Sequence, residues 1–146
     1  MKRNVSRILA VMMLYKYEIT NEKEDIENIN KLLAECADDE IDVDYDDKFM
    51  NELYDGVLNN IKKIDMIIAR ALDNYTVDRL SIVDRNILRV GTYELLFTKT
   101  PKNIVINEVV EISKTYSETN DLHSSKFNNG VIDKIAKIIE GARSNE

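Results

Sequence analysis

The chain has 146 residues, of which 44% are hydrophobic and 32% are charged, and its formal net charge is −7. This length and composition allow one hydrophobic core and exclude two large independent domains. No apolar run approaches the roughly 18 residues of a membrane span, and no signal-peptide pattern is present, so we expect a cytoplasmic protein without membrane contact. With one cysteine and one histidine the chain forms neither an internal disulfide nor a Cys/His zinc site, and we expect no cofactor.

The acidic side chains are concentrated in one part of the sequence. Residues 20–60 carry fourteen acidic and three basic side chains, whereas residues 1–19 carry one acidic and four basic ones. A local basic region can therefore bind phosphate groups although the chain as a whole is acidic.

The first expected element is a helix over residues 3–19. Its apolar side chains recur at steps of three and four, which predicts an inward stripe of Val5, Ile8, Met12, Tyr15 and Ile19. Arg3 and Arg7 lie one turn apart near its start, where the helix dipole disfavours cations, so helix stability does not explain them. They are either solvated terminal residues or phosphate ligands.

The next segments predict three helices and an acidic linker. Residues 22–37 and 47–63 show the helical spacing of apolar side chains, and residues 64–73 predict a shorter helix. Seven of the ten residues over 38–47 are acidic, which favours a solvated linker over an ion site.

The helix expected over residues 81–97 has the strongest apolar pattern and should be largely buried. Gly91 within its apolar stripe costs about 1 kcal/mol of helix propensity, which we explain by the close approach of another backbone. Arg85 and Arg89 share a face and repel each other, so carboxylates from other elements must lie near them.

Two further helices complete the chain. Pro101 ends the central helix, and helical spacing continues over residues 103–118 and 125–140. Glu108 and Glu111 flank the buried face of the first of these helices and are the expected partners of the two arginines of the central helix.

Together these segments predict an all-α fold, a compact helical bundle of about seven helices without strands. We expect a single domain over residues 1–146, with an N-terminal lobe over about residues 1–73 and a C-terminal lobe over about residues 76–141. The sequence contains no glycine-rich phosphate loop, no HExxH motif and no nucleophile with a plausible histidine base. A binding protein is therefore favoured over an enzyme.

Four motifs follow one another along the chain. They are RILAVMMLYKYE (residues 7–18), DRNILRVGTYELL (84–96), INEVVEISK (106–114) and KFNNGVIDKI (126–135). In this order and at these separations, they resemble the NusB family of bacterial transcription antitermination factors. The resemblance covers nearly the whole chain.

The resemblance implies a factor that binds the boxA element of ribosomal RNA transcripts as single-stranded RNA. Binding would occur together with NusE, a small-subunit ribosomal protein, and other Nus factors would join at the RNA polymerase elongation complex. The RNA-contacting positions of the family match Lys2, Arg3, Arg7, Lys126 and Phe127 of this sequence. The basic side chains would hold phosphates, and Phe127 would either stack on a base or begin the core of its helix.

The same resemblance places the contact with the protein partner at Tyr15 and Asp84. The spacing of Tyr15 also fits a core residue, and Asp84 follows Ser81 at the spacing of a capping box. We expect Asp84 to serve both its own helix and the partner.

Two other interpretations stay open at this point. One is a helical protein-interaction adapter or homodimer with little RNA binding of its own. The other is a helical module related to the one attached to ribosomal RNA cytosine methyltransferases. A separate hypothesis is that the acidic residues 38–47 oppose RNA binding by charge repulsion.

Overall fold

The computed structural model describes residues 2–23, 45–73, 76–117 and 123–144, and these residues form six α-helices and one short 3-10 helix. The elements are α1 (Lys2–Thr20), α3 (Asp47–Asn59), α4 (Ile61–Ala71), η1 (Val77–Arg79), α5 (Ile82–Phe97), α6 (Lys102–Tyr116) and α7 (His123–Ser144). No strand occurs in these residues, which confirms the predicted all-α class. The helix expected over 22–37 and the acidic linker lie almost entirely outside the described residues. None of the described helices is long and apolar enough to cross a membrane.

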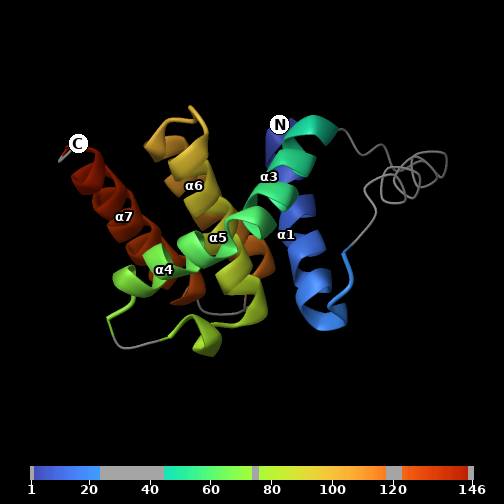
Figure 1. Cartoon of the computed structure of the whole chain (residues 1–146), viewed down its shortest axis with the longest axis horizontal. Helices are drawn as coiled ribbons and strands as arrows, with labels where there is room; N and C mark the ends of the chain where they lie inside the picture. The colour runs from blue at the N-terminus through green and yellow to red at the C-terminus, as the bar shows by residue number, and fades with distance from the viewer. Residues whose placement is uncertain (1, 24–44, 74–75, 118–122, 145–146) are drawn as a thin grey trace.

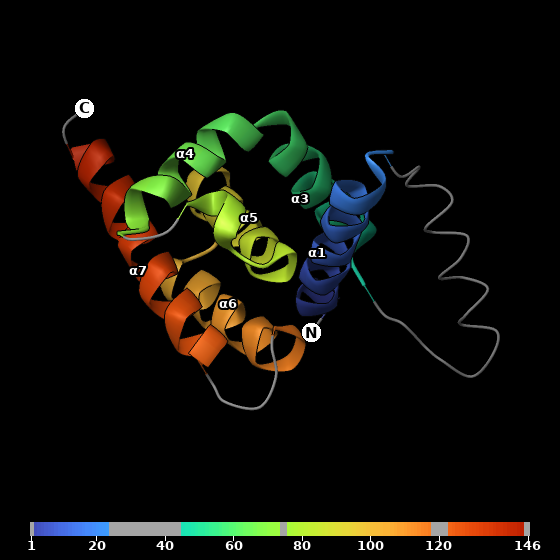
Figure 2. The same ribbon diagram turned by 90° about the horizontal axis from the view of Figure 1, so that it is seen from below.

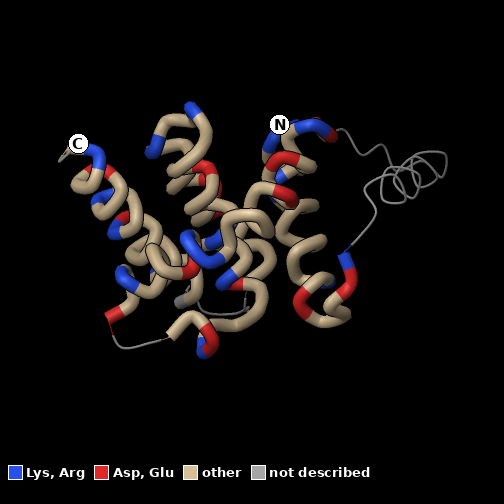
Figure 3. Tube along the Cα trace, viewed as in Figure 1, with Lys and Arg blue, Asp and Glu red and all other residues tan. Residues whose placement is uncertain are grey.

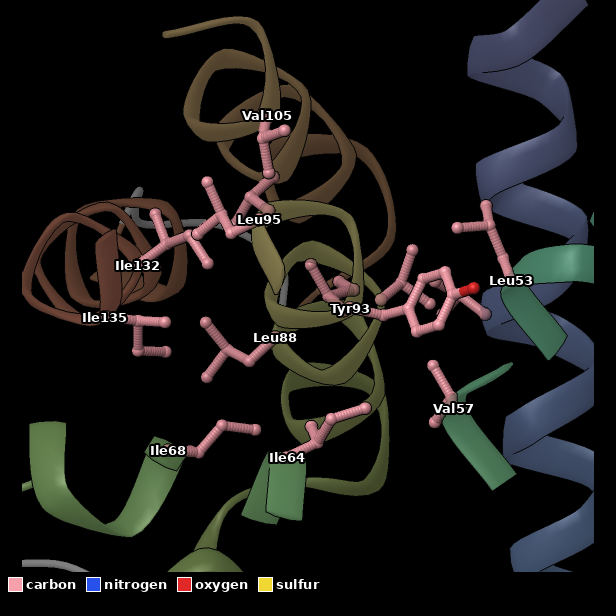
Figure 4. Packing of buried hydrophobic residues seen from close by; sticks show 14 of the residues in the cluster. Leu53, Val57, Ile64, Ile68, Leu88, Tyr93, Leu95, Val105, Ile132 and Ile135 are labelled. Carbon is pink, nitrogen blue, oxygen red and sulfur yellow. The ribbon is translucent and has the colours of Figure 1, made fainter. Parts of the chain in front are cut away.

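Helix α5 lies at the centre of the bundle, with α1 and α3 on one side and α6 and α7 on the other (Figure 1 and Figure 2). Every residue from Asn86 to Leu95 is buried, which confirms the prediction of a buried central helix. Aliphatic side chains from the surrounding helices lie around α5, among them Val57, Ile64 and Ile132 (Figure 4). Burying each such side chain contributes about 1.5–3 kcal/mol, so the core forms around this helix.

The buried face of α1 differs from the predicted stripe. The residues that α1 buries are Ser6, Arg7, Ala10, Val11, Met13 and Leu14. Met12, Tyr15 and Ile19, which the periodicity placed inward, are exposed. The reason is that Ser6 and Arg7 have hydrogen-bond partners inside the bundle, so a face with two polar residues packs inward.

The boundary between α3 and α4 lies earlier than predicted, at Asn60. Its backbone N–H and its side-chain Nδ2 both donate to the carbonyl oxygen of Gly56, at 3.1 and 2.8 Å, and these bonds end α3. Ile61 therefore begins α4, which packs against α5 and α7 (Figure 2). The division into two lobes stays a prediction.

Gly91 allows neighbouring helices to approach α5. A Cβ atom at this position would lie 2.7 Å from Cγ2 of Val109 on α6 and 3.1 Å from Cδ1 of Ile132 on α7. The expected close approach is present, but it is made by two side chains and not by another backbone.

Candidate nucleic-acid interface

Arg7 is buried in an ion pair with Glu94 of α5. Its Nε and Nη2 atoms donate to the two carboxylate oxygens at 2.7 and 2.9 Å. The two side chains are only 5% and 1% exposed. A phosphate that captured Arg7 would leave Glu94 buried without a counter-charge, at a cost of about 3–5 kcal/mol. Direct RNA contact by Arg7, which stays a prediction, would require this pair to open.

Arg3 lies one turn before Arg7 and is exposed. Its guanidinium lies 4.4 Å from the centroid of the Phe49 ring, and that of Arg7 lies 5.2 Å from the same centroid. A cation–π contact of this kind contributes about 0.5–1 kcal/mol at an exposed site. It therefore orients the side chain of Arg3 while its charge stays accessible. Lys2, next in the chain, is also exposed, so basic residues gather at the start of α1 (Figure 3).

Phe49 is positioned by the start of α3. The side chain of Asp46 accepts the N–H of Phe49 at 3.1 Å and caps the helix. The Ser6 hydroxyl of α1 accepts the N–H of Asp46 at 2.8 Å. A cap of this kind contributes about 1 kcal/mol. The two bonds hold α3 against α1, so that the Phe49 ring lies beneath both arginines.

A buried asparagine positions the start of α7. Nδ2 of Asn128 donates to Oδ1 of Asp84 and to Oγ of Ser113, both at 3.0 Å, and the residue is fully buried. The hydroxyl of Ser117 donates to the same oxygen of Asp84. These bonds join the start of α5, the end of α6 and the start of α7.

Lys126 and Phe127 directly precede this buried asparagine on α7. Lys126 is exposed, and Phe127 is 36% exposed, so part of its ring faces solvent. The start of α1 lies at the top of Figure 1 and the start of α7 near the bottom. A single RNA strand that contacts both places must therefore extend along the bundle.

The structure addresses only the capping part of the role predicted for Asp84, and its contact with the partner stays a prediction. Ser81 caps the helix as predicted, because its hydroxyl oxygen accepts the N–H of Asp84 at 3.1 Å. The carboxylate of Asp84, however, binds Ser117 and Asn128 of other helices. Its expected capping function is therefore replaced by a connection between three helices. Tyr15 is 39% exposed on α1 and is not a core residue.

The two arginines of α5 are neutralised by Glu18 and Asp65. The carboxylate of Glu18 on α1 accepts hydrogen bonds from both Arg85 and Arg89. Asp65 on α4 accepts two bonds from Arg89, at 2.8 Å each. Burial raises the pKa of Glu18, but the hydrogen bonds and positive charges of the two arginines outweigh burial and lower it overall.

The expected pairing of Glu108 or Glu111 with these arginines is therefore wrong. Glu108 accepts a bond from Nδ2 of Asn4 at 2.6 Å and lies 3.9 Å from Nη1 of Arg7. Glu111 pairs with Lys114 on the surface of α6 at 3.5 Å. Sequence spacing shows that a carboxylate is required, but it does not show which helix supplies it.

Among the described residues, no group of three or more His, Cys, Asp or Glu side chains gathers at a position that could hold a metal ion. The site consists instead of separate basic and aromatic side chains, which are suited to phosphates and bases.

Comparison with known proteins identifies the family. The model of the NusB family matches residues 4–137. The chain belongs to the NusB family. The transcription antitermination protein NusB of Fervidobacterium nodosum is 40% identical over 140 residues, which cover 93% of this chain and 91% of the relative. That of Sulfurovum sp. is 35% identical over 135 residues, covering 92% and 98%.

Solved NusB structures share the fold. A structure of T. maritima NusB matches with a TM-score of 0.72 and 37% identity, covering 94% of this chain and 92% of that one. A chain from a crystal structure of NusB and NusE in complex with double-stranded RNA matches with a TM-score of 0.72 and 30% identity, covering 92% and 96%.

Proposed function

We propose that this chain is a cytoplasmic, non-enzymatic transcription antitermination factor. It binds boxA-type single-stranded RNA together with NusE and acts at the RNA polymerase elongation complex with other Nus factors. The observation that carries this proposal is the NusB family match over residues 4–137. A related chain solved with NusE and double-stranded RNA supports NusE as the protein partner and RNA as the class of ligand.

Two groups of side chains bind the RNA in this proposal. Lys2 and Arg3 hold phosphates at the start of α1, and Lys126 holds a phosphate at the start of α7. Phe127 stacks on a base, a contact that contributes about 1–3 kcal/mol in comparable proteins. Arg7 acts indirectly, because its pair with Glu94 fixes the helix that presents Arg3.

NusE binds next to Tyr15 in this proposal. Tyr15 shares the exposed apolar side of α1 with Met12 and Ile19, and large exposed apolar side chains in a row favour a protein contact. Asp84 holds the start of α7 through Ser117 and Asn128 and contributes to the same partner surface.

Fluorescence anisotropy with a short boxA-like RNA tests the proposal. The RNA and a scrambled control are titrated at two salt concentrations, with and without purified NusE. Sequence-dependent binding that strengthens with NusE is expected. Equal and feeble binding of both RNAs in the presence of NusE would contradict the RNA function and favour the adapter interpretation. Light scattering would then show whether the chain is a monomer or a homodimer.

The partner surface is tested by replacing Tyr15 with Ser. Met66 on α4 offers a control, because it is another exposed apolar residue on a different helix. Tyr15→Ser should weaken NusE binding, whereas Met66→Ser should not. Equal NusE affinities for both variants would remove Tyr15 from the interface.

A further inference from the structure

An open groove begins at Arg3, at the start of α1, and extends to residues that the family resemblance does not assign to RNA. Its volume is about 690 Å³, and it lies between α1, α3 and the link from α5 to α6. The lining residues that matter here are Arg3, Phe49, Glu52, Phe97, Lys99 and Ile104. A volume of this size falls in the range of roughly 300–1,000 Å³ that accommodates small-molecule-sized groups.

The groove presents a fixed aromatic ring to solvent. Phe97, the last residue of α5, is 43% exposed. Its ring centroid lies 5.1 Å from that of Tyr93 at an interplanar angle of 40°, and Nζ of Lys63 lies 5.5 Å from the Phe97 centroid. These contacts hold the ring in place, and a large part of its surface is left open to a ligand.

The charges around the groove favour an anionic ligand. Arg3 and Lys99 form no ion pair with any residue that the structure describes. Glu52 is an acid in the lining, and it accepts a hydrogen bond from the hydroxyl of Tyr93 at 3.2 Å. Figure 3 shows basic positions at the start of α1 and at the link between α5 and α6, both at the top of the view.

We propose that this groove binds an unpaired nucleotide of the RNA strand, with its base stacked on Phe97 and an adjacent phosphate held by Lys99. The inference rests on the proposed function, because Arg3 belongs both to that RNA surface and to the groove. An aromatic ring beside basic side chains is the arrangement with which proteins bind single-stranded nucleic acid without reading base edges. The RNA path therefore continues from the start of α1 toward the α5–α6 link.

Fluorescence anisotropy tests this proposal by measuring the RNA affinity of the full chain in the presence of NusE. The RNA is boxA-like and is extended at either end. Phe97→Ala should weaken binding roughly 5- to 150-fold, the equivalent of one lost stacking contact. Phe97→Leu keeps an apolar side chain but removes the aromatic ring, so it should also weaken RNA binding. This variant provides the test if Phe97→Ala does not fold. Met66→Ala is the control for an exposed apolar residue.

The charge is tested in the same titration. Lys99→Gln should weaken binding, whereas Lys137→Gln, a change at an exposed lysine of α7, should leave it unchanged. Each nucleotide is then replaced in turn by an abasic one. Removing the base that stacks on Phe97 should weaken RNA binding by the original chain. The same abasic RNA should bind Phe97→Leu with nearly the same affinity as the intact RNA, because this variant has already lost the stacking contact.

Three results would overturn the inference. If the original chain binds no RNA with NusE present, the proposed function fails and the groove inference fails with it. If the original chain binds but both Phe97 variants bind equally well, only the groove inference fails. If the Phe97 variants weaken NusE binding in the absence of RNA, the groove is a protein-docking surface.

Discussion

Arg3 and Arg7 are separated by one turn of α1, yet their surroundings differ completely. Arg3 is exposed above the ring of Phe49, and Arg7 is buried against Glu94. The family resemblance matches both to RNA-contacting positions, because it compares residue types and does not include their burial. The partner that distinguishes them, Glu94, lies 87 residues further along the chain.

Replacing Arg7 with Met should lower the free energy of unfolding by about 3–5 kcal/mol, because Glu94 is then buried without a partner. Urea denaturation measures this change. The double variant Arg7→Met with Glu94→Leu should recover most of the lost stability, since it removes the uncompensated charge. A double variant that is less stable than the single one would contradict this account.

Arg3→Met is the matched control for Arg7→Met. The variant loses only the exposed contact with Phe49, so its stability should change by no more than about 1 kcal/mol. Its affinity for RNA should nevertheless fall. If Arg3→Met is as destabilised as Arg7→Met, the separation into a contact residue and a positioning residue is wrong.

At the scale of elements, the sequence predicts best where one pattern is long and unambiguous. The apolar run of α5 predicts a buried central helix, and Ser81 is correctly predicted to cap it. The face of α1 is predicted wrongly, because periodicity counts Ser6 and Arg7 as outward residues. Their burial depends on partners in α3 and α5, and a single sequence does not show these partners.

The candidate site, too, is predictable only where it depends on residues that are close together in the sequence. Lys2, Arg3 and Lys126 are exposed, as an RNA-binding role requires. The groove beside Phe97 has no sequence motif. It exists because α1 and the link between α5 and α6 meet in space, so only the structure reveals it.

Asn128 offers a test of how the start of α7 is held. Asn128→Asp keeps the size of the side chain but replaces the donor that binds Asp84 by a second carboxylate. Like charges this close inside the bundle should lower the free energy of unfolding by about 3 kcal/mol or more at pH 7. Thermal unfolding at pH 7 measures the loss.

Asn129, the exposed neighbour of Asn128, provides the control for this change. Asn129→Asp introduces the same charge at the surface and should alter stability by no more than about 0.5 kcal/mol. Equal effects of the two changes would show that Asn128 does not hold the three helices together.

At the scale of the whole molecule, the net charge of −7 contrasts with the basic start of α1. RNA binding through such a local region should weaken as salt increases, with a slope of about −0.7 in log K against log salt for each phosphate contact. Lys2, Arg3 and Lys126 give a slope of about −2, and a phosphate held by Lys99 adds about −0.7. Arg3→Gln should make the slope less steep by about 0.7, as measured by anisotropy from low to moderate salt. An unchanged slope would show that Arg3 holds no phosphate.

The network around Glu18 joins α1, α4 and α5, so its titration should affect the stability of the whole bundle. The folded chain holds the pKa of Glu18 below its ordinary value of 4.5, because Arg85 and Arg89 outweigh the opposing effect of burial. A carboxylate with a lowered pKa stabilises the folded state fully above its unfolded pKa. This contribution is lost as pH falls through the folded value.

Glu18→Gln should therefore reduce the free energy of unfolding at pH 7 by about 1.5–3 kcal/mol, the range for a hydrogen bond to a charged group. The difference from the original chain should shrink once the pH falls below 4.5, because protonation of Glu18 then removes from the original chain the charge that Glu18→Gln already lacks. Urea denaturation at pH 7, 5 and 3 measures the difference directly. Glu140→Gln, which removes an exposed carboxylate paired with Lys102, should show no comparable difference at any of these values. A Glu18→Gln difference that stayed constant down to pH 3 would mean that the two arginines do not stabilise the fold through the charge of Glu18.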